Sequence, residues 1–538
     1  MLVFFKRSKS NFASLKLKAK VEVAMNKIVD TAIVSAEQMS QIEEQVFSAG
    51  MPVAALMEKA ARLCTQRIMS LYPVSEFASA GVLVGPGHNG GDALVIAREL
   101  YLAGYKVKVY RPLFQLKPLT TQHANYAASL GIGFYEEVEP LQKCRLIIDG
   151  LFGFGLTRDL PENVIGAIDL INSWSQPVVS IDVPSGIHTD TGAVLGGAIK
   201  ATHTLCLGLW KRAFFQDRAL EYIGSSERID FGLLPHHVWP ILPQPAPLRQ
   251  MTTAIALKSL PLPRAATTYK YRQGHLLLIC GSRTYAGAAI LTALGARASG
   301  VGMLSIAVPE SLKTLITTRL PDALTVECPE NKEGAIASLP FSTTDLNKFD
   351  VVACGPGLTT DAKSVVEKIL QAQCPLVLDA DGLNILSEHD VAEVLGQRSA
   401  PTVLTPHIGE FKRLFPQITD TDDRLQAVQT AAEKSNAIVL LKGAKTAIAN
   451  PQGLIWLISQ STPALARGGS GDILTGLTAG LAAQSVKKEL SLFDSVAIAA
   501  WWHARAAIKA AHERTELGVD AVTLAEYITP TINDLLNH

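Results

Sequence analysis

The chain has 538 residues, of which 48% are hydrophobic, and its 49 lysines and arginines balance 49 aspartates and glutamates. Zero net charge gives no reason to expect nucleic acid as a partner, and the length predicts two or more domains with large cores. No apolar run reaches the roughly 20 residues of a membrane span. The seven cysteines are scattered without a C-x-x-C pair. We therefore expect a reduced, cytoplasmic chain with inert cysteines rather than disulfides or a zinc site.

The N-terminal 20 residues carry six lysines and arginines and no acidic residue. They lack the long apolar core and the small-residue cleavage pattern of a targeting segment. We interpret residues 1–32 as a basic N-terminal extension. It is either a basic tail or a stretch upstream of a true start at Met25.

A first α/β unit is expected over residues 33–240. Short apolar runs predict buried strands at 81–84, 106–110, 146–149 and 177–181, and helical patterns at 92–103 and 164–173 separate them. Strands that alternate with helices predict a parallel sheet covered on both faces.

A proline-rich passage between residues 235 and 263 predicts a linker, and a second α/β unit is expected over 251–538. Helices are predicted at 287–298 and 493–512. The predicted strands are 275–279, 303–308, 351–354, 376–378, 402–404, 438–441 and 454–458.

A glycine loop follows the first predicted strand. Gly85, Gly87 and Gly90 spell the G-x-G-x-x-G pattern of dinucleotide-binding turns. Two details oppose the ordinary version: Asp92 would enter the first helical turn, and no acid follows the strand at 106–110 to hold a ribose hydroxyl. The alternative is a tight turn that binds no ligand.

Two more loops of the first unit begin with an aspartate at a predicted strand end, Asp149 and Asp182. The carboxyl ends of parallel strands form the edge at which open α/β sheets bind ligands. With the amide of Asn89 and the hydroxyl of Ser185, these carboxylates are hard oxygen donors of low total charge. Such donors suit a monovalent or weakly held cation better than zinc. Asp182 could also be a simple cap or turn former.

In the second unit, the most informative stretch is the glycine-rich turn 466–472, followed by a long apolar helical segment. Bare backbone N–H groups at a helix N-terminus bind anions, and Asp472 stands beside that site. An anion hole next to a fixed carboxylate predicts phosphoryl transfer to a hydroxyl. Five further loops at predicted strand ends, 281–288, 355–358, 379–384, 405–410 and 442–446, would line one crevice with it, and no GxxxxGK[ST] motif is present.

The first unit resembles the YjeF N-terminal domain, the NAD(P)HX epimerase, in LMEKAAR (56–62), VGPGHNGGDALVIAREL (84–100), DGLFGFGLTRDL (149–160), SIDVPSGIHTDTG (180–192) and ATHTLCLGLWKRAFF (201–215). The resemblance implies potassium at Asn89, Asp149 and Ser185. It implies contacts of the hydrated dinucleotide with His88, Asn89, Gly90, Gly91, Asp92, Gly153, Phe154, Gly155, Leu156, Thr157, Arg158, Asp159 and Asp182. The sequence departs from the family's usual pattern at His88, Ala93 and Phe154, which affects fine contacts rather than the class.

The second unit resembles the YjeF C-terminal domain, the ribokinase-like NAD(P)HX dehydratase, in GSRTYAGAAI, CGPGL, LDADGLN, LTPHIGEFKRL, LLKGAKT and GGSGDILTG. The resemblance implies contacts with the hydrated dinucleotide at Ala288, Gly357, His407 and Asp472. It implies nucleotide contacts at Lys442, Gly443, Ala444, Lys445, Thr446 and Gly471. Two of these residues have simpler interpretations: His407 as a strand-end capper and Lys442 as a solvated charge.

We therefore expect an α/β protein of two domains, a Rossmann-like three-layer domain over 33–240 and a ribokinase-like domain over 251–538. The resemblance implies a bifunctional repair enzyme. The first domain would interconvert the R and S forms of NAD(P)H hydrate, with Asp182 moving the proton. The second would dehydrate the S form with ADP, giving AMP and phosphate, with Asp472 as base and Mg²⁺ bridging the phosphates. The fused arrangement resembles the prokaryotic one, which implies ADP rather than ATP.

Two other interpretations remain at this point. One is a kinase for a small alcohol, such as a vitamin precursor, fused to a dinucleotide-binding domain, and the other makes the first domain a non-catalytic scaffold. The expected partners are the small molecules NADHX, NADPHX and ADP, in a homo-oligomer without nucleic acid or membrane. The small-residue stretch 476–483 would pack either between subunits or inside the core.

Overall fold

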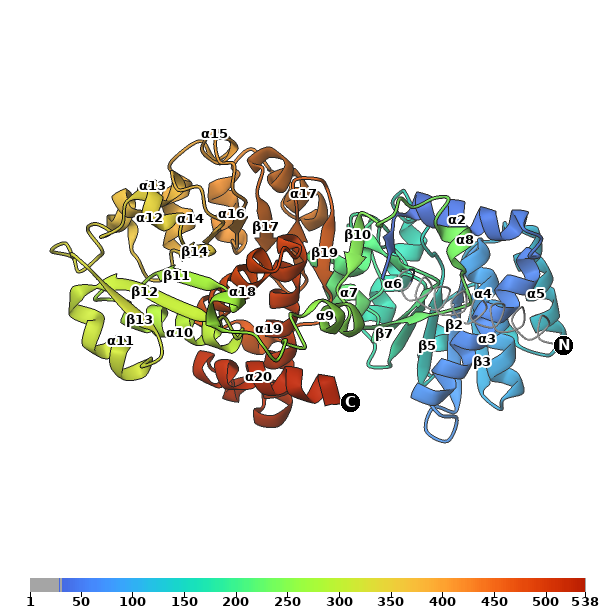
Figure 1. The fold of residues 1–538 in the computed structure, drawn as a ribbon. Helices are drawn as coiled ribbons and strands as arrows, with labels where there is room; N and C mark the ends of the chain where they lie inside the picture. The colour runs from blue at the N-terminus through green and yellow to red at the C-terminus, as the bar shows by residue number, and fades with distance from the viewer. Residues whose placement is uncertain (1–28, 30, 538) are drawn as a thin grey trace, which may run out of the picture. The chain divides into compact units, whose positions relative to one another are not determined.

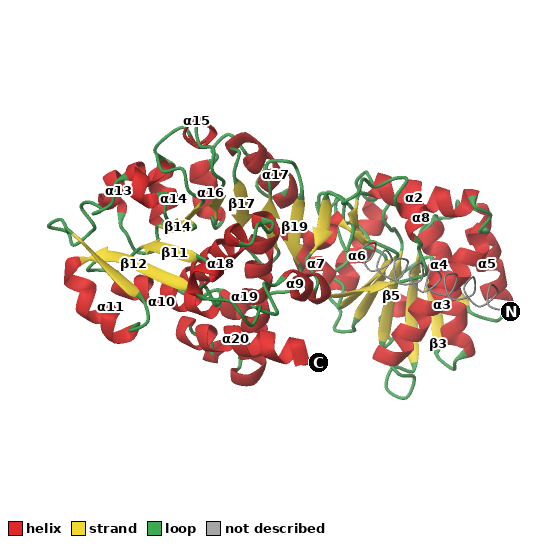
Figure 2. Ribbon diagram, in the orientation of Figure 1, coloured by secondary structure: helices red, strands yellow, loops and turns green. Residues whose placement is uncertain are grey.

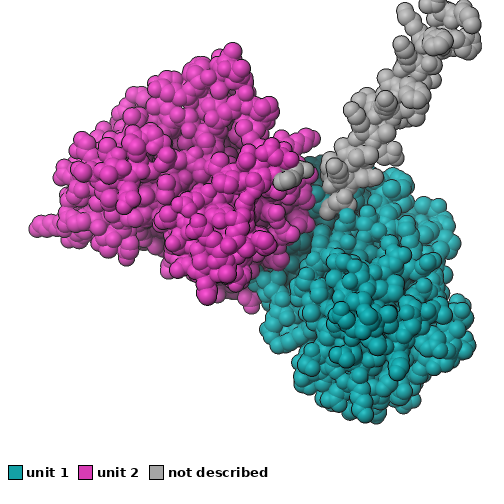
Figure 3. Space-filling model, turned by 90° about the horizontal axis from the view of Figure 1, so that it is seen from below, with its two compact units in different colours: residues 1–247 teal, residues 248–538 magenta. Residues whose placement is uncertain are grey.

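The computed structural model describes residue 29 and residues 31–537, so the predicted extension over 1–32 lies almost wholly outside the described residues. The chain divides into two compact units, residues 1–247 and 248–538 (Figure 3). Across the described residues, no helix combines the length and the apolar character needed to cross a membrane.

The described part of the first unit contains a seven-stranded sheet in which all neighbouring strands are parallel (Figures 1 and 2). Its strands, in spatial order, are β4 (Gly133–Tyr135), β3 (Lys106–Tyr110), β2 (Ser79–Val84), β5 (Leu146–Gly150), β6 (Val178–Ile181), β7 (His203–Leu207) and β9 (Ser225–Ile229). The predicted parallel sheet is thereby confirmed. The chain order reverses between β2 and β5, which is where such sheets open a ligand crevice.

Helices cover both faces of this sheet. The helices of the unit are α2 (Ala36–Ser48), α3 (Val53–Leu71), α4 (His88–Leu102), α5 (Pro118–Ser129), α6 (Glu162–Asn172), α7 (Leu220–Ile223) and α8 (Pro235–Val238). One core packs α3, α4 and α5 against residues such as Val82 and Ile148, and the other packs α6 against Leu83 and Ile147. Alternate residues of a strand point to opposite faces, so this continuous apolar pattern is the one expected of a sheet covered on both sides.

Helix α4 begins four residues earlier than predicted, at His88, with Gly87 as its N-cap. Asp92 therefore lies in the second turn of the helix, and its predicted place in the first turn is wrong. Gly90 and Gly91 read as loop residues because glycine disfavours helix interiors. They are helical here because a Cβ on Gly90 would lie 1.9 Å from the Gly85 carbonyl oxygen, so only glycine lets the turn pack this closely.

A separate parallel pair is formed by β1 (Ile33–Val34) and β8 (Trp210–Lys211), with Val34 opposite Lys211. This pair joins two segments that are far apart in the sequence. It fixes the backbone at Lys211, which matters for the site described below.

The second unit contains, among the described residues, a ten-stranded sheet that is parallel except where β18 pairs with its two neighbours. The strands, in spatial order, are β10 (Leu248–Gln250), β19 (Ile455–Ile458), β18 (Thr446–Ala449), β17 (Ile438–Leu441), β16 (Thr402–Leu404), β15 (Leu376–Leu378), β14 (Val351–Cys354), β11 (His275–Ile279), β12 (Met303–Pro309) and β13 (Leu324–Cys328). The chain order reverses between β14 and β11.

The helices of this unit are α9 (Thr253–Ser259), α10 (Ala286–Ala298), α11 (Lys313–Arg319), α12 (Thr343–Leu346), α13 (Lys363–Leu370), α14 (Asp381–Leu386), α15 (Val391–Gly396), α16 (Ile408–Leu414), α17 (Arg424–Ser435), α18 (Ser470–Lys487), α19 (Leu492–Arg514) and α20 (Ala521–Asn537). One large core packs α10, α18, α19 and α20 against the sheet, and Figure 1 shows α13 to α16 on its other side.

The small-residue stretch 476–483 lies inside this core. A Cβ on Gly476 would be 1.8 Å from the Thr292 carbonyl oxygen, and one on Gly480 would be 2.1 Å from the Ser299 hydroxyl oxygen. Of the two interpretations, packing inside the core is the correct one, because α18 uses its glycines to approach α10.

The proline-rich passage is largely built into the two units. Pro235 opens α8, and Val238, Leu242 and Ala246 are buried in the core of the first unit. Leu248 then begins β10, which pairs with β19 in the second unit. The connection is therefore shorter than the predicted linker, because its apolar residues are buried.

Candidate functional site

The predicted loops of the first unit meet at the carboxyl edge of its sheet. Strands β2, β5 and β6 end side by side, so the loops after Val84, Gly150 and Ile181 are neighbours. A Cβ on Gly85 would lie 1.6 Å from the Leu151 carbonyl oxygen, so the loops after β2 and β5 touch through backbone alone.

Asp149 is fully buried at this edge and accepts hydrogen bonds from neutral groups. Ser180 Oγ donates at 2.7 Å, the Ser185 N–H at 2.9 Å and Ser185 Oγ at 2.5 Å. Burial raises the pKa of Asp149 against the lowering effect of these hydrogen bonds. A buried carboxylate with only neutral donors is a site that a bound cation would stabilise.

Asn89 faces the same loops. Its Nδ2 is buried without a hydrogen-bond partner, and its Cγ and Oδ1 lie 3.2 and 3.3 Å from where a Cβ on Gly153 would be. Asn89, Asp149 and Ser185 are oxygen donors that carry one charge between them. Their oxygen atoms fit a monovalent cation, whereas the orphaned Nδ2 is a hydrogen-bond donor that a ligand oxygen could satisfy.

Asp182 follows β6 and is held in an unusual conformation, with a φ of 71°, in the left-handed region that non-glycine residues rarely adopt. Its Oδ2 accepts a hydrogen bond from the Phe154 N–H at 3.1 Å, and its Oδ1 accepts from the Leu207 N–H at 3.3 Å. Backbone strain of this kind clusters at functional sites. The carboxylate accepts hydrogen bonds from two segments that are distant in the sequence, so it is not the simple cap or turn former of the alternative interpretation.

Lys211 pairs with this carboxylate. Its Nζ lies 2.5 Å from Asp182 Oδ1, and the two side chains are only 1% and 4% exposed. The motif 201–215 contains Lys211, but sequence reasoning gave it no role. The available signal was weak: Lys211 and Arg212 stand together within the otherwise apolar run 209–215, and unpaired lysines are rarely buried.

Two more acids surround the pair. Burial, reinforced by Asp182 and Glu43, raises the pKa of Asp92 well above its ordinary range. Burial also raises the pKa of Glu43 on α2 to about 7, with Lys211 opposing and Asp182 adding to the shift. Glu43 was not predicted. His88 is exposed, and burial and then Lys117 lower its pKa.

The loop after β5 places its predicted residues unequally. Gly153 lies between Asn89 and Asp182. A Cβ on Gly153 would be 3.2 Å from Asn89 Cγ and 3.2 Å from Asp182 Oδ2. The Leu156 side chain packs in the core, which leaves its backbone for a ligand. Thr157, Arg158 and Asp159 are exposed, as is Gly155.

The predicted loops of the second unit also converge at a carboxyl edge. Strands β11, β14, β15, β16 and β17 are successive neighbours, so their loops share one crevice. A Cβ on Gly355 would lie 1.8 Å from the Asp379 carbonyl oxygen. A Cβ on Gly357 would lie 2.7 Å from the Ala288 Cβ, which brings these two predicted contacts together.

Asp379 is the buried centre of this site, although sequence reasoning gave it no role. Lys442 Nζ lies 2.8 Å from Asp379 Oδ1, and Thr475 Oγ1 donates to Asp379 Oδ2 at 2.6 Å. The Lys442 side chain is 21% exposed and also lies 3.9 Å from Glu410. Lys442 is therefore not the solvated charge of the simpler interpretation.

Asp472 lies in the first turn of α18, as predicted, with Gly469 as a left-handed N-cap. Burial and, after it, the charge of Asp379 raise the pKa of Asp472 to about 7, while Lys442 opposes the rise. Gly471 faces the lysine, because its absent Cβ would lie 3.6 Å from Lys442 Nζ. The first N–H groups of a helix lack intrahelical acceptors, so this turn provides donors for an anion.

His503 on α19 supports the same turn and was also missed. Its Nε2 lies 2.9 Å from the Ser470 carbonyl oxygen, and burial lowers its pKa to about 4. A neutral imidazole that donates from Nε2 fixes the first residue of α18. A histidine within a buried helical run was the only sequence signal.

His407 caps α16 through its side chain. Its Nδ1 accepts from the Gly409 N–H at 2.9 Å and the Glu410 N–H at 3.3 Å, while the side chain stays 55% exposed. The capping interpretation is correct. Its Nε2 lies 3.6 Å from Glu410 Oε1, and the exposed part of the ring leaves a ligand contact available as well.

Arg424 fixes the backbone at the start of the loop 442–446, because it donates to the Leu441 and Lys442 carbonyl oxygens at 3.2 and 3.4 Å. Gly443 and Ala444 are exposed, Lys445 Nζ donates to the Ser459 carbonyl oxygen, and Thr446 begins β18. The loop thus has a fixed backbone and exposed tip residues.

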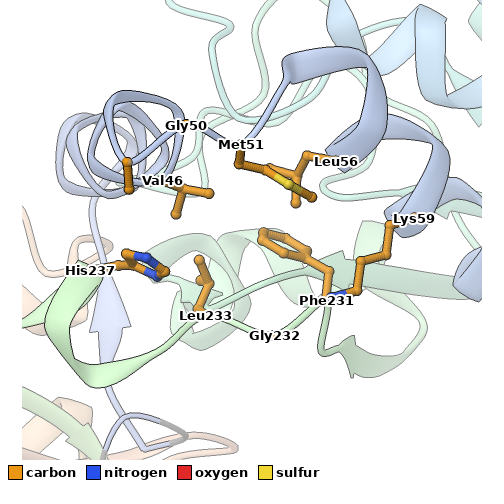
Figure 4. Close-up of a pocket in the computed structure, with 10 residues that line it drawn as sticks. Val46, Gly50, Met51, Leu56, Lys59, Phe231, Gly232, Leu233 and His237 are labelled. Atoms are coloured by element: carbon orange, nitrogen blue, oxygen red, sulfur yellow. The ribbon is translucent and has the colours of Figure 1, made fainter.

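A hollow of about 370 Å³ in the first unit involves none of the predicted residues (Figure 4). It lies between the end of α2, the start of α3 and the segment 231–237. Its lining residues are Val46, Ala49, Gly50, Met51, Leu56, Lys59, Phe231, Gly232, Leu233 and His237.

Comparison with known proteins identifies the family. The family model described as YjeF-related protein N-terminus matches residues 53–213, and the model described as NAD(P)H-hydrate dehydratase matches residues 276–530. The "Bifunctional NAD(P)H-hydrate repair enzyme Nnr" of Synechocystis sp. is 55% identical over 94% of this chain and 95% of its own length. Its namesake from Thermosynechococcus vestitus is 51% identical over 94% and 98%. The chain therefore belongs to the bifunctional NAD(P)H-hydrate repair enzyme family.

A solved structure of the ADP/ATP-dependent NAD(P)H-hydrate dehydratase from Bacillus subtilis, co-crystallized with ATP/Mg²⁺, is also similar. It is 30% identical, covers 53% of this chain and 97% of its own chain, and aligns with a TM-score of 0.46.

Proposed function

We propose that this protein repairs hydrated NADH and NADPH in two reactions. The domain over 33–240 interconverts the R and S hydrates, and the domain over 251–538 dehydrates the S hydrate with ADP, giving NAD(P)H, AMP and phosphate. The observation that carries the proposal is the 55% identity along 94% of the chain to a bifunctional repair enzyme, in a chain with a built site in each unit. An alcohol kinase accounts for the second site but not for the first.

In the dehydratase site, the oxygen of the C6 hydroxyl attacks the terminal phosphorus of ADP. Asp472 takes the proton of that hydroxyl as the attack proceeds. The bond between that phosphorus and the AMP oxygen breaks. The C6–O bond then breaks, phosphate leaves, and loss of the neighbouring ring proton restores the C5=C6 double bond. A carboxyl group with a pKa of about 7 suits this exchange at neutral pH.

The remaining residues of that site bind and orient the reactants. Lys442, Gly443, Ala444, Lys445, Thr446 and Gly471 contact the nucleotide, and Ala288, Gly357 and His407 contact the hydrated dinucleotide. Lys442 supports this role because its ammonium lies beside Gly471 at the start of α18. When bound, Mg²⁺ would neutralise negative charge on the nucleotide phosphates.

In the epimerase site, Asp182 moves a proton as the C6–O bond breaks and forms again on the other face of the ring. Its Oδ2 is the oxygen next to Gly153, where the loop leaves space beside the backbone. Asn89, Asp149 and Ser185 would hold potassium, which would supply a fixed positive charge at the carboxyl edge of the sheet.

The test uses purified R and S hydrates with and without ADP and Mg²⁺, followed by NADH absorbance. Pure S hydrate should recover its absorbance only when ADP is present, and pure R hydrate should recover it through the S form. Absence of recovery from pure S hydrate would overturn the dehydratase. If absorbance recovers from the S hydrate but recovers from the R hydrate no faster than the uncatalysed rate, the first unit is a non-catalytic scaffold. A stable phosphorylated product would favour the kinase.

A further inference from the structure

We propose that Lys211 is a positioning residue for epimerisation, holding the Asp182 carboxylate so that one of its oxygens faces the substrate. The inference rests on the proposed epimerase activity of the first unit. It adds a residue and a division of labour between the two oxygens of Asp182.

The first step is the fixation of Oδ1. Lys211 Nζ lies 2.5 Å from this oxygen, and the Leu207 N–H donates to it at 3.3 Å. With the lysine side chain 1% exposed and the aspartate side chain 4% exposed, water cannot replace either donor. Charge-assisted hydrogen bonds in a dry environment are strong and directional.

The second step is the orientation of Oδ2. Once Oδ1 is held, Oδ2 must point toward the loop after β5, where the Phe154 N–H donates to it at 3.1 Å. Oδ2 also lies 3.2 Å from the Cβ position of Gly153, where a side chain would fill the space. Oδ2 is therefore the oxygen that a ligand at this loop can reach.

The third step is the fixation of Lys211 itself. Its backbone is paired with Val34 through β1 and β8, and its ammonium also donates to the Leu207 carbonyl oxygen. The ammonium lies 5.6 Å from the centre of the Phe154 ring. Burial lowers the pKa of Lys211, but Asp182, Cys206 and Glu43 outweigh it, so the lysine stays charged. A charge held on every side has a positional role rather than a mobile one.

A positioning role predicts a specific kinetic pattern. Lys211→Met should lower kcat for R-to-S conversion by about 100-fold and change KM less than threefold, because the lysine acts on the reacting group and not on binding. Lys211→Arg, which keeps the charge, should retain at least a tenth of the wild-type rate. Lys200→Met, which removes an exposed ion pair with Glu221 elsewhere in the unit, is the matched control and should leave kcat unchanged.

The double variant decides whether Lys211 acts through Asp182. In the Asp182→Asn background, adding Lys211→Met should lower the residual rate by less than threefold, since there is no carboxylate left to orient. A further 100-fold loss in that background would overturn the proposal, as would a full rate for Lys211→Met. If Lys211→Met is unstable, Lys211→Arg still decides: a loss as large as expected for methionine, in a protein with an unchanged thermal transition, contradicts the proposal. A wild-type protein that does not epimerise would instead overturn the proposed function and this inference with it.

Discussion

The two sites use the same pair of residue types in different ways. Each has an aspartate that we propose to react, at the carboxyl edge of parallel strands, and a lysine nearby. In the first unit Lys211 pairs with that aspartate, Asp182, itself. In the second unit Lys442 pairs with a neighbour, Asp379, at 2.8 Å, and the pKa of Asp472 rises to about 7.

The difference shows that the partner of the lysine determines whether the lysine orients the aspartate or leaves it free to exchange a proton. A lysine paired directly with the carboxylate fixes the orientation of that carboxylate, so that a chosen oxygen faces the substrate. A lysine paired with a second carboxylate leaves the first one free to gain and lose a proton near neutral pH. The first arrangement sets the direction from which a proton is exchanged, and the second sets the pH at which it is exchanged.

The largest effect is expected from Asp472→Asn. It should lower ADP-dependent recovery of NADPH from the S hydrate by about 1,000-fold, because the base that takes the hydroxyl proton is lost. The same preparation should interconvert the R and S hydrates at the wild-type rate, which is the control for its concentration. NADPH recovery at an undiminished rate would remove Asp472 from the mechanism.

The reciprocal change, Asp182→Asn, should lower R-to-S conversion by about 100-fold and leave dehydration of pure S hydrate unaffected. Chromatographic separation of the two hydrates over time measures the conversion. An asparagine variant that still equilibrates the hydrates at full rate would show that Asp182 serves structure alone.

The variant Asp379→Asn should make the second site resemble the first, because Lys442 could then pair with Asp472. In the wild type, kcat/KM for dehydration should rise with pH through about 7, because Asp472 must lose its proton to act as base. Asp379→Asn removes a negative charge and frees Lys442 for Asp472, so the midpoint should move down by about one pH unit. Asp534→Asn, an exposed carboxylate on α20, should leave the midpoint where it was. An unmoved midpoint in Asp379→Asn would contradict the comparison.

The smallest effect is expected from Glu43→Gln in the first unit. Folding raises the pKa of Glu43 from 4.5 to about 7, so the folded unit binds this proton more tightly than the unfolded chain. The free energy of unfolding therefore contains a contribution that is present below pH 4.5 and lost as the pH rises through 7. Glutamine should remove this decline, which is about 2 kcal/mol between pH 5 and pH 8. Urea midpoints for loss of epimerase activity measure it, and identical pH dependence in both proteins would contradict it.

The buried parallel strands were the most predictable part of the fold. Strands β3, β11, β14, β15, β16 and β17 have the predicted boundaries, because a strand covered on both faces is a short continuous apolar run. Three of the strands that were missed carry a weaker pattern. β4 is half-buried, β13 is partly exposed at a sheet edge, and β18 is the alanine-containing TAIA segment.

The polar part of each site was predictable only where a motif marked a strand end. Asp149, Asp182, Asp472 and the loop 442–446 stood directly after strands or at a helix start. Lys211 and His503 reach their sites from other elements, through pairing and packing that no local pattern contains. The start of α4 was misplaced for the same reason, since the need for Gly90 arises from the approach of Gly85.

The pairing of Val34 with Lys211 has a consequence for synthesis of the chain. The strand β1 is among the first described residues to leave the ribosome, and its partner β8 follows only after the six sheet strands from β2 to β7. Closing such a long loop requires most of the unit to be present. Lys211 should therefore become buried only late in the folding of the first unit during synthesis. A nascent chain that ends before residue 210 would have its sheet strands up to β7 but no ammonium beside Asp182.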